Sequence, residues 1–178
     1  MSGMITIPDS DLRLVPVQPE TDRPAIVEIL SDADVRAGLL CPSSSTDWPV
    51  DYESVRKFEA NAGHKTHFCL CQNGETIGAL SFGVYHQKVL AEIGFFLKSS
   101  LWNQGIMTAC LNAACEHAFR EWEYPALYAC VLDENRACIR VLEKCGFHRD
   151  CETRLKEDGK EIPAWWFVVV EEDFMCPF

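Results

Sequence analysis

A polar turn between an apolar strand and a helix is the segment of this sequence best suited to hold an anion. The strand ends at Leu97, the turn follows, and a helical pattern begins at Gly105. The first N–H groups of a helix have no partner within it, and with the helix dipole they favour a bound negative charge such as phosphate. Because the turn contains a single glycine, the pattern alone is explained more often by ordinary helix capping.

Glu92 is the second residue whose type and position could do chemistry. It is the only ionisable side chain between Val89 and Leu97, in a run that is otherwise nearly all apolar. Partial burial raises the pKa of a carboxyl group toward neutrality, which suits a general base. The alternative is a solvated carboxylate whose charge is balanced by Lys88.

The ten cysteines have no spacing typical of a metal site or a disulfide framework. None of them forms a C-x-x-C pair, the spacing at which zinc ribbons and knuckles cluster their ligands. With 178 residues the chain can build a core without disulfides. We expect most of the cysteines to be reduced, small, buried side chains. No metal is predicted either from the scattered histidines, which are expected to be structural or exposed: His64, His67, His86, His117 and His148.

The elements that must position these residues follow from hydrophobic periodicity and turn residues. Helical patterns are predicted at residues 21–30, 51–62, 105–122 and 135–144. Strand patterns are predicted at residues 12–17, 67–72, 75–85, 89–97, 127–132, 148–155 and 162–171. Strands and helices in this order predict a mixed α/β (α+β) sheet with helices packed on it.

Local signals set several of the boundaries. Thr21 or Asp22 is the expected N-cap of the first helix, and residues 41–49 are expected to form a loop. Pro16 is expected to limit the first strand to a sheet edge. Asn73-Gly74 predicts a tight hairpin, because both residues accept positive φ.

Composition excludes several classes of function. The formal net charge of −11 argues against a nucleic-acid-binding surface and slightly favours cationic partners such as amines. No apolar run approaches the roughly 18–20 residues that span a bilayer, so no membrane partner is expected. Residues 1–14 lack a signal-peptide pattern, and we expect a cytoplasmic protein. Without a linker or repeat, residues 1–178 are expected to form a single domain.

Two motifs resemble those of the GNAT acetyltransferases. Residues 102–108, Trp-Asn-Gln-Gly-Ile-Met-Thr, resemble the coenzyme loop of the Rim-type branch, which acetylates N-terminal amines of ribosomal proteins and commonly has Trp-Gly-Lys-Gly-Ile-Met-Thr there. Residues 135–147 resemble the family's Asn-x-x-Ser motif with its Leu-x-Lys-x-Gly-Phe ending. The likeness covers roughly residues 10–171. It implies the GNAT fold, with six to seven mostly antiparallel strands flanked by helices and splayed between the fourth and fifth strands.

The resemblance implies acetyl-CoA as cosubstrate. Backbone groups of the splayed strand would face the pantetheine arm, and an N–H there would polarise the thioester carbonyl. Asn135 is expected both to cap its helix and to bind the coenzyme. The residues expected to contact the coenzyme are Phe95, Phe96, Leu97, Asn103, Gln104, Gly105, Ile106, Met107, Thr108, Asn135 and Arg140.

The coenzyme loop departs from the family pattern at two positions. Asn103 and Gln104 stand where the branch has Gly-Lys, so the loop loses a positive side chain. Binding would then rest on backbone N–H groups, with Gln104 and Lys98 as helpers, and we expect a weaker affinity for the coenzyme. Asn103 is expected to tolerate a positive φ.

Acetyl transfer to an amine needs a base for the amine and a proton for the departing thiolate. The candidate base is Glu92, acting through water. In many GNAT enzymes a Tyr seven residues after the motif Asn acts as the general acid for the thiolate. Leu142 occupies that position here, so this acid is absent. The Rim-type branch has a Ser three residues after that Asn, and Cys138 stands there. A thiol with a pKa of about 8.5 matches a thiolate leaving group, so Cys138 is the candidate acid. The alternative is a small residue of the cleft wall.

The function implied by the resemblance is acetyl transfer from acetyl-CoA to a primary amine, by direct attack in a ternary complex. An N-terminal amine of a protein or peptide is the expected acceptor. A small-molecule amine is the first alternative, and a non-catalytic acyl-CoA-binding module is the second. We expect a monomer or homodimer.

Overall fold

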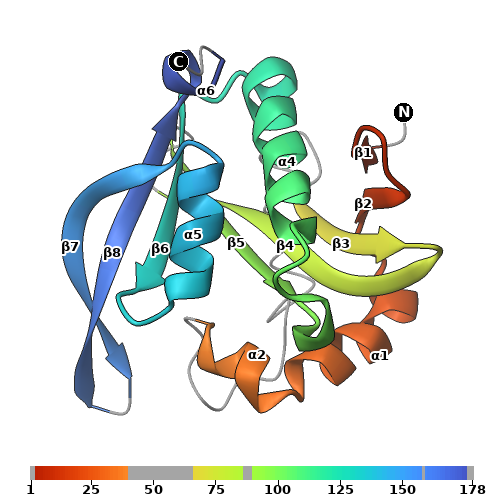
Figure 1. Ribbon diagram of the computed structural model, residues 1–178, viewed down its shortest axis with the longest axis horizontal. Coiled ribbons are helices and arrows are strands. Elements are labelled where there is room, and N and C mark those ends of the chain that lie inside the picture. The colour runs from red at the N-terminus through yellow and green to blue at the C-terminus, as the bar shows by residue number, and fades with distance from the viewer. Residues whose placement is uncertain (1–2, 40–65, 86–89, 158, 176–178) are drawn as a thin grey trace.

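The computed structural model describes residues 3–39, 66–85, 90–157 and 159–175. Its strands are β1 (Ile5–Thr6), β2 (Leu12–Pro16), β3 (His67–Gln72), β4 (Glu75–Tyr85), β5 (Leu90–Leu97), β6 (Ala126–Leu132), β7 (His148–Glu157) and β8 (Lys160–Val170). Its helices are α1 (Pro19–Leu30), α2 (Ala33–Ala37), the 3₁₀ turn η1 (Ser99–Leu101), α4 (Ile106–Trp122), α5 (Arg136–Lys144) and α6 (Glu171–Met175). The strands form one sheet in the order β1-β2-β3-β4-β5-β6-β8-β7 (Figure 1).

The sheet is mixed and mostly antiparallel, as predicted, but it has eight strands rather than six to seven. The additional strand is β1, which has only two residues and pairs with Arg13 and Leu14. Because β1 covers that part of β2, the first predicted strand does not lie at the sheet edge. Pro16 lies beyond the β1 pairing, so its missing N–H removes no hydrogen bond on that side.

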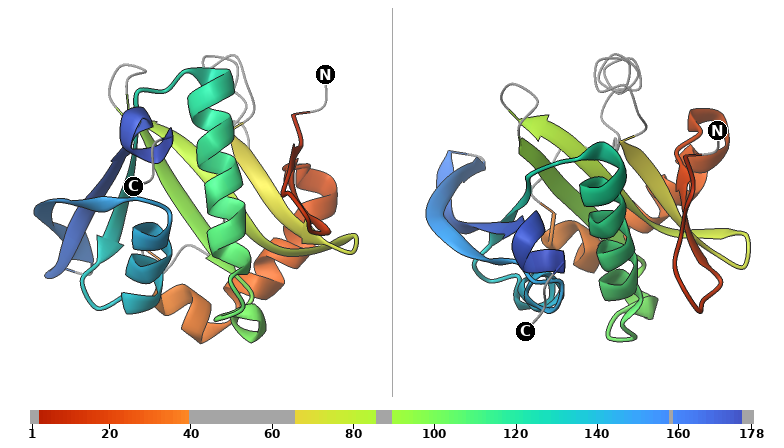
Figure 2. Two further views of the ribbon diagram at one scale, coloured as in Figure 1. Left: turned by 45° about the horizontal axis from the view of Figure 1, so that its top comes forward. Right: turned by 90° about the horizontal axis from the view of Figure 1, so that it is seen from above.

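Helices cover both faces of the sheet (Figure 2). On one face α4 and α5 pack on the main core, where Leu111, Phe119 and Leu142 are almost completely buried. On the other face α1 and α2 pack over β3, β4 and β5 in a smaller core. Burial of both faces explains why β5 is an almost continuous apolar run rather than an alternating one.

An aromatic cluster holds the C-terminal end of α4 against the sheet. Trp122 stacks on Phe68 with ring centroids 6.3 Å apart and meets Phe82 edge-on at 4.9 Å. His117 lies edge-on to Trp122 at 5.1 Å, and burial lowers its pKa. His117 is therefore structural, as expected, while His148 is exposed. These contacts fix the axis of α4, whose other end is the predicted anion site.

The helices differ from the sequence prediction at their ends. α1 begins at Pro19, and its N-cap is Gln18 rather than Thr21 or Asp22. Proline suits the first helical position because its missing N–H would have no helical partner there. Asp22 instead accepts a hydrogen bond from the Gln18 backbone N–H at 2.6 Å. The helix predicted at 51–62 and the loop at 41–49 lie outside the described residues.

Burial of the cysteines follows the expectation in part. Of the eight described cysteines, all are free and four are buried: Cys69, Cys110, Cys115 and Cys145. Cys151 is exposed, in β7 at the outer edge of the sheet. The β7–β8 register shifts between Arg149 and Cys151, so Asp150 is an extra residue in the strand. No helix of the described part of the chain is long and apolar enough to cross a membrane.

Candidate active site at the separation of β5 and β6

The parallel neighbours β5 and β6 pair only at their N-terminal ends. Their register joins Ala91 to Leu127 and Glu92 to Tyr128, and among the described residues it goes no further. Beyond this point the two strands diverge (Figure 1). The structure thus shows the splay where the resemblance placed it, between the fourth and fifth predicted strands.

The antiparallel ladder with β4 determines which β5 groups face the separation. The N–H of Lys98 donates to the Ile77 carbonyl of β4 at 2.9 Å, so the backbone groups of Phe96 also point toward β4. Those of Phe95 and Leu97 point the opposite way, toward β6. The Phe96 side chain is buried in the smaller core. Of the three expected backbone contacts, the geometry favours Phe95 and Leu97 over Phe96.

The start of α4 presents unpaired N–H groups. No described side chain caps it, and the N-cap residue is Gly105 with φ 77°. The Ala109 N–H donates to the Gly105 carbonyl at 3.0 Å, which leaves the N–H groups of Ile106, Met107 and Thr108 without helical acceptors. The Met107 side chain is buried in the main core and anchors this first turn. A phosphate group fits such a helix start.

The turn before α4 is held by its own side chains. The Trp102 indole N–H donates to the Leu97 carbonyl at 2.9 Å, and the Gln104 amide donates to the Ser100 carbonyl at 3.3 Å. Asn103 takes φ 61°, the left-handed conformation that its residue type predicted. Two left-handed residues within three positions turn the chain sharply from η1 into α4.

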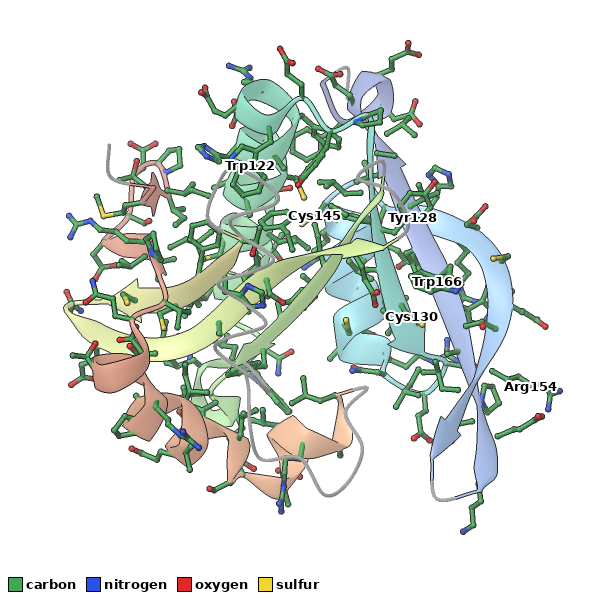
Figure 3. The ribbon with its side chains drawn as sticks, turned by 180° about the vertical axis from the view of Figure 1, so that it is seen from behind. Trp122, Tyr128, Cys130, Cys145, Arg154 and Trp166 are labelled. Atoms are coloured by element: carbon green, nitrogen blue, oxygen red, sulfur yellow. The ribbon has the colours of Figure 1, made fainter. Side chains whose placement is uncertain are left out.

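Glu92 lies on the opposite sheet face from α4. Its register partners are Gly83 on β4 and Tyr128 on β6. Burial raises the pKa of the Glu92 carboxyl group. Burial is also the main cause of the raised pKa of the Cys130 thiol, and the negative charge of Glu92 adds to it. Figure 3 shows Tyr128, Cys130 and Trp166 gathered on this face. The half-buried carboxyl group expected from the sequence is therefore present.

Asn135 and Cys138 occupy the N-terminal turn of α5. Asn135 is the N-cap, and its Oδ1 accepts the Cys138 N–H at 3.1 Å. Its Nδ2 donates to the Gly38 carbonyl at 3.1 Å, a contact with α2 that the sequence did not suggest. Burial raises the pKa of the Cys138 thiol to about 12, so the assumed match to a thiolate leaving group does not hold here. In this environment the thiol is better suited to donate a hydrogen bond than a proton.

The other expected coenzyme residues have simpler surroundings. Arg140 is exposed on α5. The Thr108 carbonyl accepts a hydrogen bond from the Cys145 thiol at 3.5 Å, which joins the start of α4 to the end of α5. Gln104 and Gly105 are exposed at the turn. Within the described residues no group of His, Cys, Asp or Glu side chains could hold a metal ion.

Sequence reasoning missed a second contact between α2 and this site. The Ser99 hydroxyl donates to the Asp32 carboxylate, 67 residues earlier in the chain. Asp32 precedes Ala33 and Asp34, and it caps α2 by accepting the Asp34 N–H at 2.9 Å. An Asp before a helix former is a capping signal. A helix of five residues is too short for periodicity to reveal.

Comparison with known proteins places this geometry in a family. The sequence model of the acetyltransferase (GNAT) domain matches residues 11–148. The probable N-acetyltransferase YjcK of Bacillus subtilis (strain 168) is 38% identical over 60 residues, which span 34% of this chain and 33% of that protein. The sequence match therefore extends over about a third of this relative's length.

Solved structures extend the similarity to nearly the whole chain. Mycobacterium smegmatis RimJ, solved in complex with CoA-disulfide, is 26% identical with a TM-score of 0.78, over 97% of this chain and 88% of that one. A Salmonella typhimurium acetyl transferase that modifies the N-terminal serine of a 50S ribosomal subunit protein is 19% identical, with a TM-score of 0.80 over 94% and 98% of the two chains. At 19% identity, the similarity to the Salmonella protein is evidence for a shared fold alone. With a family match over most of its length, the chain belongs to the GNAT acetyltransferase family.

Proposed function

We propose that this GNAT protein transfers acetyl from acetyl-CoA to the N-terminal amine of a protein or peptide. The observation that carries the proposal is the uncapped start of α4 beside the separation of β5 and β6. Together these features offer an anion site and, next to it, β5 backbone groups that face away from β4 and that an extended pantetheine arm could bind. The family match and the CoA ligand of RimJ support this use of the site.

The acceptor side is supported by the surroundings of Glu92. A Cβ added to Gly83 would meet only the Glu92 carbonyl, at 3.7 Å, among the described atoms within 4 Å. A Cβ added to Gly94 would meet the Ser81 hydroxyl at 3.4 Å and no other atom of the described residues within 4 Å. Among the described residues, two glycines thus flank Glu92 without filling the space beside it, and we infer that a small group can approach the carboxyl group there. A primary amine is small and, when protonated, complementary to a carboxylate.

The reaction moves one acetyl group and one proton. The neutral amine nitrogen forms a bond to the acetyl carbon, and the bond from that carbon to sulfur breaks. The proton lost by the amine passes to Glu92 through water, and the thiolate takes a proton from solvent. In this proposal an N–H of Phe95 or Leu97, which face away from β4, stabilises the developing oxyanion. Cys138 donates a hydrogen bond toward the departing sulfur.

The acceptor is the least constrained part of the proposal, and a substrate panel tests it. Thiol release from acetyl-CoA would be followed with peptides that have a free or a blocked N-terminus and an internal lysine. A polyamine, an aminoglycoside and free amino acids complete the panel. Turnover only with free N-termini, with the acetyl group located there by mass spectrometry, is the expected result.

Other outcomes identify the alternatives. Turnover with small amines alone would replace the proposal by small-molecule acetylation. Tight acetyl-CoA binding without turnover of any acceptor would replace it by a coenzyme-binding module. Failure to bind acetyl-CoA would refute the site itself.

A further inference from the structure

The short helix α2 is tied at both ends to elements that flank the separation of β5 and β6. At its N-cap, Asp32 accepts a hydrogen bond from the hydroxyl of Ser99, the first residue of η1. At its C-cap, the Gly38 carbonyl accepts a hydrogen bond from Nδ2 of Asn135, the N-cap of α5. In Figures 1 and 2, α2 lies across the open end of the two diverging strands.

The geometry at Gly38 shows how closely α2 approaches α5. A Cβ at this position would lie 2.9 Å from Asn135 Nδ2, which is closer than real Cβ contacts. Gly38 has φ −89°, a conformation open to any residue. The backbone therefore does not require glycine here, whereas the contact with Asn135 does.

Packing adds a third point of attachment. Val35, in the middle of α2, is buried in the smaller core together with Phe96 of β5. The helix thus shares an apolar core with β5, accepts a hydrogen bond from η1 through the Asp32 carboxylate, and accepts one from the Asn135 side-chain amide of α5 through the Gly38 carbonyl. The Ser99 hydroxyl keeps the pKa of Asp32 below its ordinary value, so the carboxylate stays charged at neutral pH. The Ser99 contact would be lost only as the pH falls through that lowered pKa.

Each polar attachment adjoins a part of the candidate site. Ser99 begins the turn that leads to the uncapped start of α4. Asn135 is tied to α2 through Nδ2 and accepts the Cys138 N–H through Oδ1. A shift of α2 would therefore act on the coenzyme loop from one end and on the Cys138 turn from the other.

We propose that residues 32–38, here called the strap, set the separation of the two diverging strands for catalysis. Asp32, Ser99 and Gly38 are then positioning residues: they touch no reacting atom but fix the elements that do. The catalytic part of this inference rests on the proposed acetyl transfer. Its mechanical part, a link from Ser99 to α5 through the strap, does not.

Hydrogen exchange on the free protein tests the mechanical part. Ser99→Ala removes the hydroxyl that holds Asp32. If the strap carries the change to Asn135, the Cys138 amide should exchange faster by about fivefold, although the hydrogen bond described for the Ser99 side chain goes to Asp32 and not to α5. Ser99→Thr, which keeps the hydroxyl, should restore slow exchange. Ser31→Ala is the matched control, because the Ser31 hydroxyl, at the C-cap of α1, donates back to the Val27 carbonyl at 2.7 Å and, among the described residues, does not join α2 to η1 or α5. An unchanged Cys138 amide in Ser99→Ala would overturn the link.

Steady-state kinetics and calorimetry test the catalytic part. Ser99→Ala and Gly38→Ala should each lower kcat by about tenfold, since a misplacement near 1 Å can cost about a hundredfold. Acetyl-CoA affinity should fall by a smaller factor than kcat, because the N–H groups at the start of α4 are not themselves altered and Met107 still anchors that turn in the core. The double variant should be no slower than the slower single variant, because releasing either end already frees the strap.

The remaining outcomes separate this inference from the proposed function. If the two substitutions multiply their effects, or if Ser99→Ala weakens acetyl-CoA binding as much as it lowers kcat, the strap does not position the site. If the wild-type protein turns over no acceptor, the proposed function fails, and exchange at the Cys138 amide still decides whether the strap links Ser99 to α5.

Discussion

Glu92 lies where β5 is still hydrogen-bonded to a neighbour on each side, so the sheet fixes its position. Burial raises the pKa of its carboxyl group, and proton uptake from an amine becomes more favourable as that pKa approaches neutrality. The pairing of β5 on both sides thus gives Glu92 the fixed position and the partial burial that a general base needs. The same burial has two opposite consequences, one for activity and one for stability.

Glu92→Gln should lower kcat/KM by roughly 10²- to 10⁴-fold at neutral pH, with acetyl-CoA affinity little changed. In the wild type the rate should fall as the pH drops through the raised pKa of Glu92, because the protonated carboxyl group cannot accept a proton. The variant should lack this acidic limb. A variant within threefold of wild type would show that Glu92 is not the base.

Thermal unfolding of the same variant gives an independent check. The folded protein holds the Glu92 proton more tightly than the unfolded chain does, so this group destabilises the fold as the pH rises through the window above its ordinary pKa. Glu92→Gln should therefore melt at a higher temperature than wild type at neutral pH and show no gain in acid. If the variant and the wild type melted at the same temperature at neutral pH as well as in acid, the Glu92 charge would not be buried.

Cys138 is expected to matter modestly, because a thiol with a pKa of about 12 stays protonated beside a developing thiolate. Cys138→Ala should lower kcat by about tenfold, the loss expected when a hydrogen bond to the developing thiolate is removed. Cys138→Ser keeps a hydrogen-bond donor of similar volume and should recover most of the rate. Lost packing could imitate lost chemistry, so melting temperature and acetyl-CoA affinity are measured alongside. If the Ala and Ser variants lost the same factor in kcat and the same amount in melting temperature, Cys138 would contribute only packing.

Among the elements, the turn into α4 combines a rigid start with an open surface. Trp102 fixes the turn to the end of β5, Asn103 and Gly105 bend it, and Met107 anchors the helix in the core. A Cβ at Gly105 would meet no described protein atom within 4 Å. Substitution there is limited by its positive φ and by whatever ligand occupies the open space.

Gly105→Asn separates these two limits, because asparagine tolerates positive φ. Gly159, in the β7–β8 hairpin, has the same φ of 77° and equally open surroundings, which makes Gly159→Asn a matched control. Both variants should lose similar, small amounts of stability. Only Gly105→Asn should weaken acetyl-CoA binding, by about tenfold or more, or about 1.4 kcal/mol. If calorimetry found equal acetyl-CoA affinities in the two folded variants, the coenzyme phosphate would not bind at the start of α4.

Boundaries of several elements could be predicted from the sequence where local chemistry and the final environment agree. The hairpin of β3 and β4 was predicted residue for residue, because Asn73-Gly74 permits one turn between two β-rich runs. The short elements β1, α2 and α6 were missed, since two to five residues show no period.

The candidate site could be predicted less completely. The turn at Gly105 and the cap at Asn135 were found through motifs, but the splay followed from the resemblance alone. The burial of the Cys138 thiol and the contacts of Asp32 and Gly38 depend on tertiary packing that no local pattern encodes. The roles of the site residues remain predictions, as does the single domain.

At the scale of the whole molecule, the formal net charge of −11 should influence which acceptors arrive quickly. A negative field attracts cations, and salt screens it with a Debye length of about 8 Å at about 0.15 M. Two acceptor peptides with the same N-terminus would carry either lysines or glutamines far from it. Between about 0.05 and 0.5 M salt, kcat/KM should fall about threefold or more for the lysine peptide and change little for the other. Equal salt dependence would exclude steering by the molecular field.

The outer edges of the sheet bear on self-association. An unpaired strand edge is a template on which another chain can add a strand, which is a route to aggregation. β7 is such an edge, but Asp150 forms a bulge that bends it, and charged, exposed side chains line it at Arg149, Glu152 and Arg154. At the opposite edge, β1 offers only two residues. Among the described strands neither edge is both long and regular, so neither offers an extended template for strand addition.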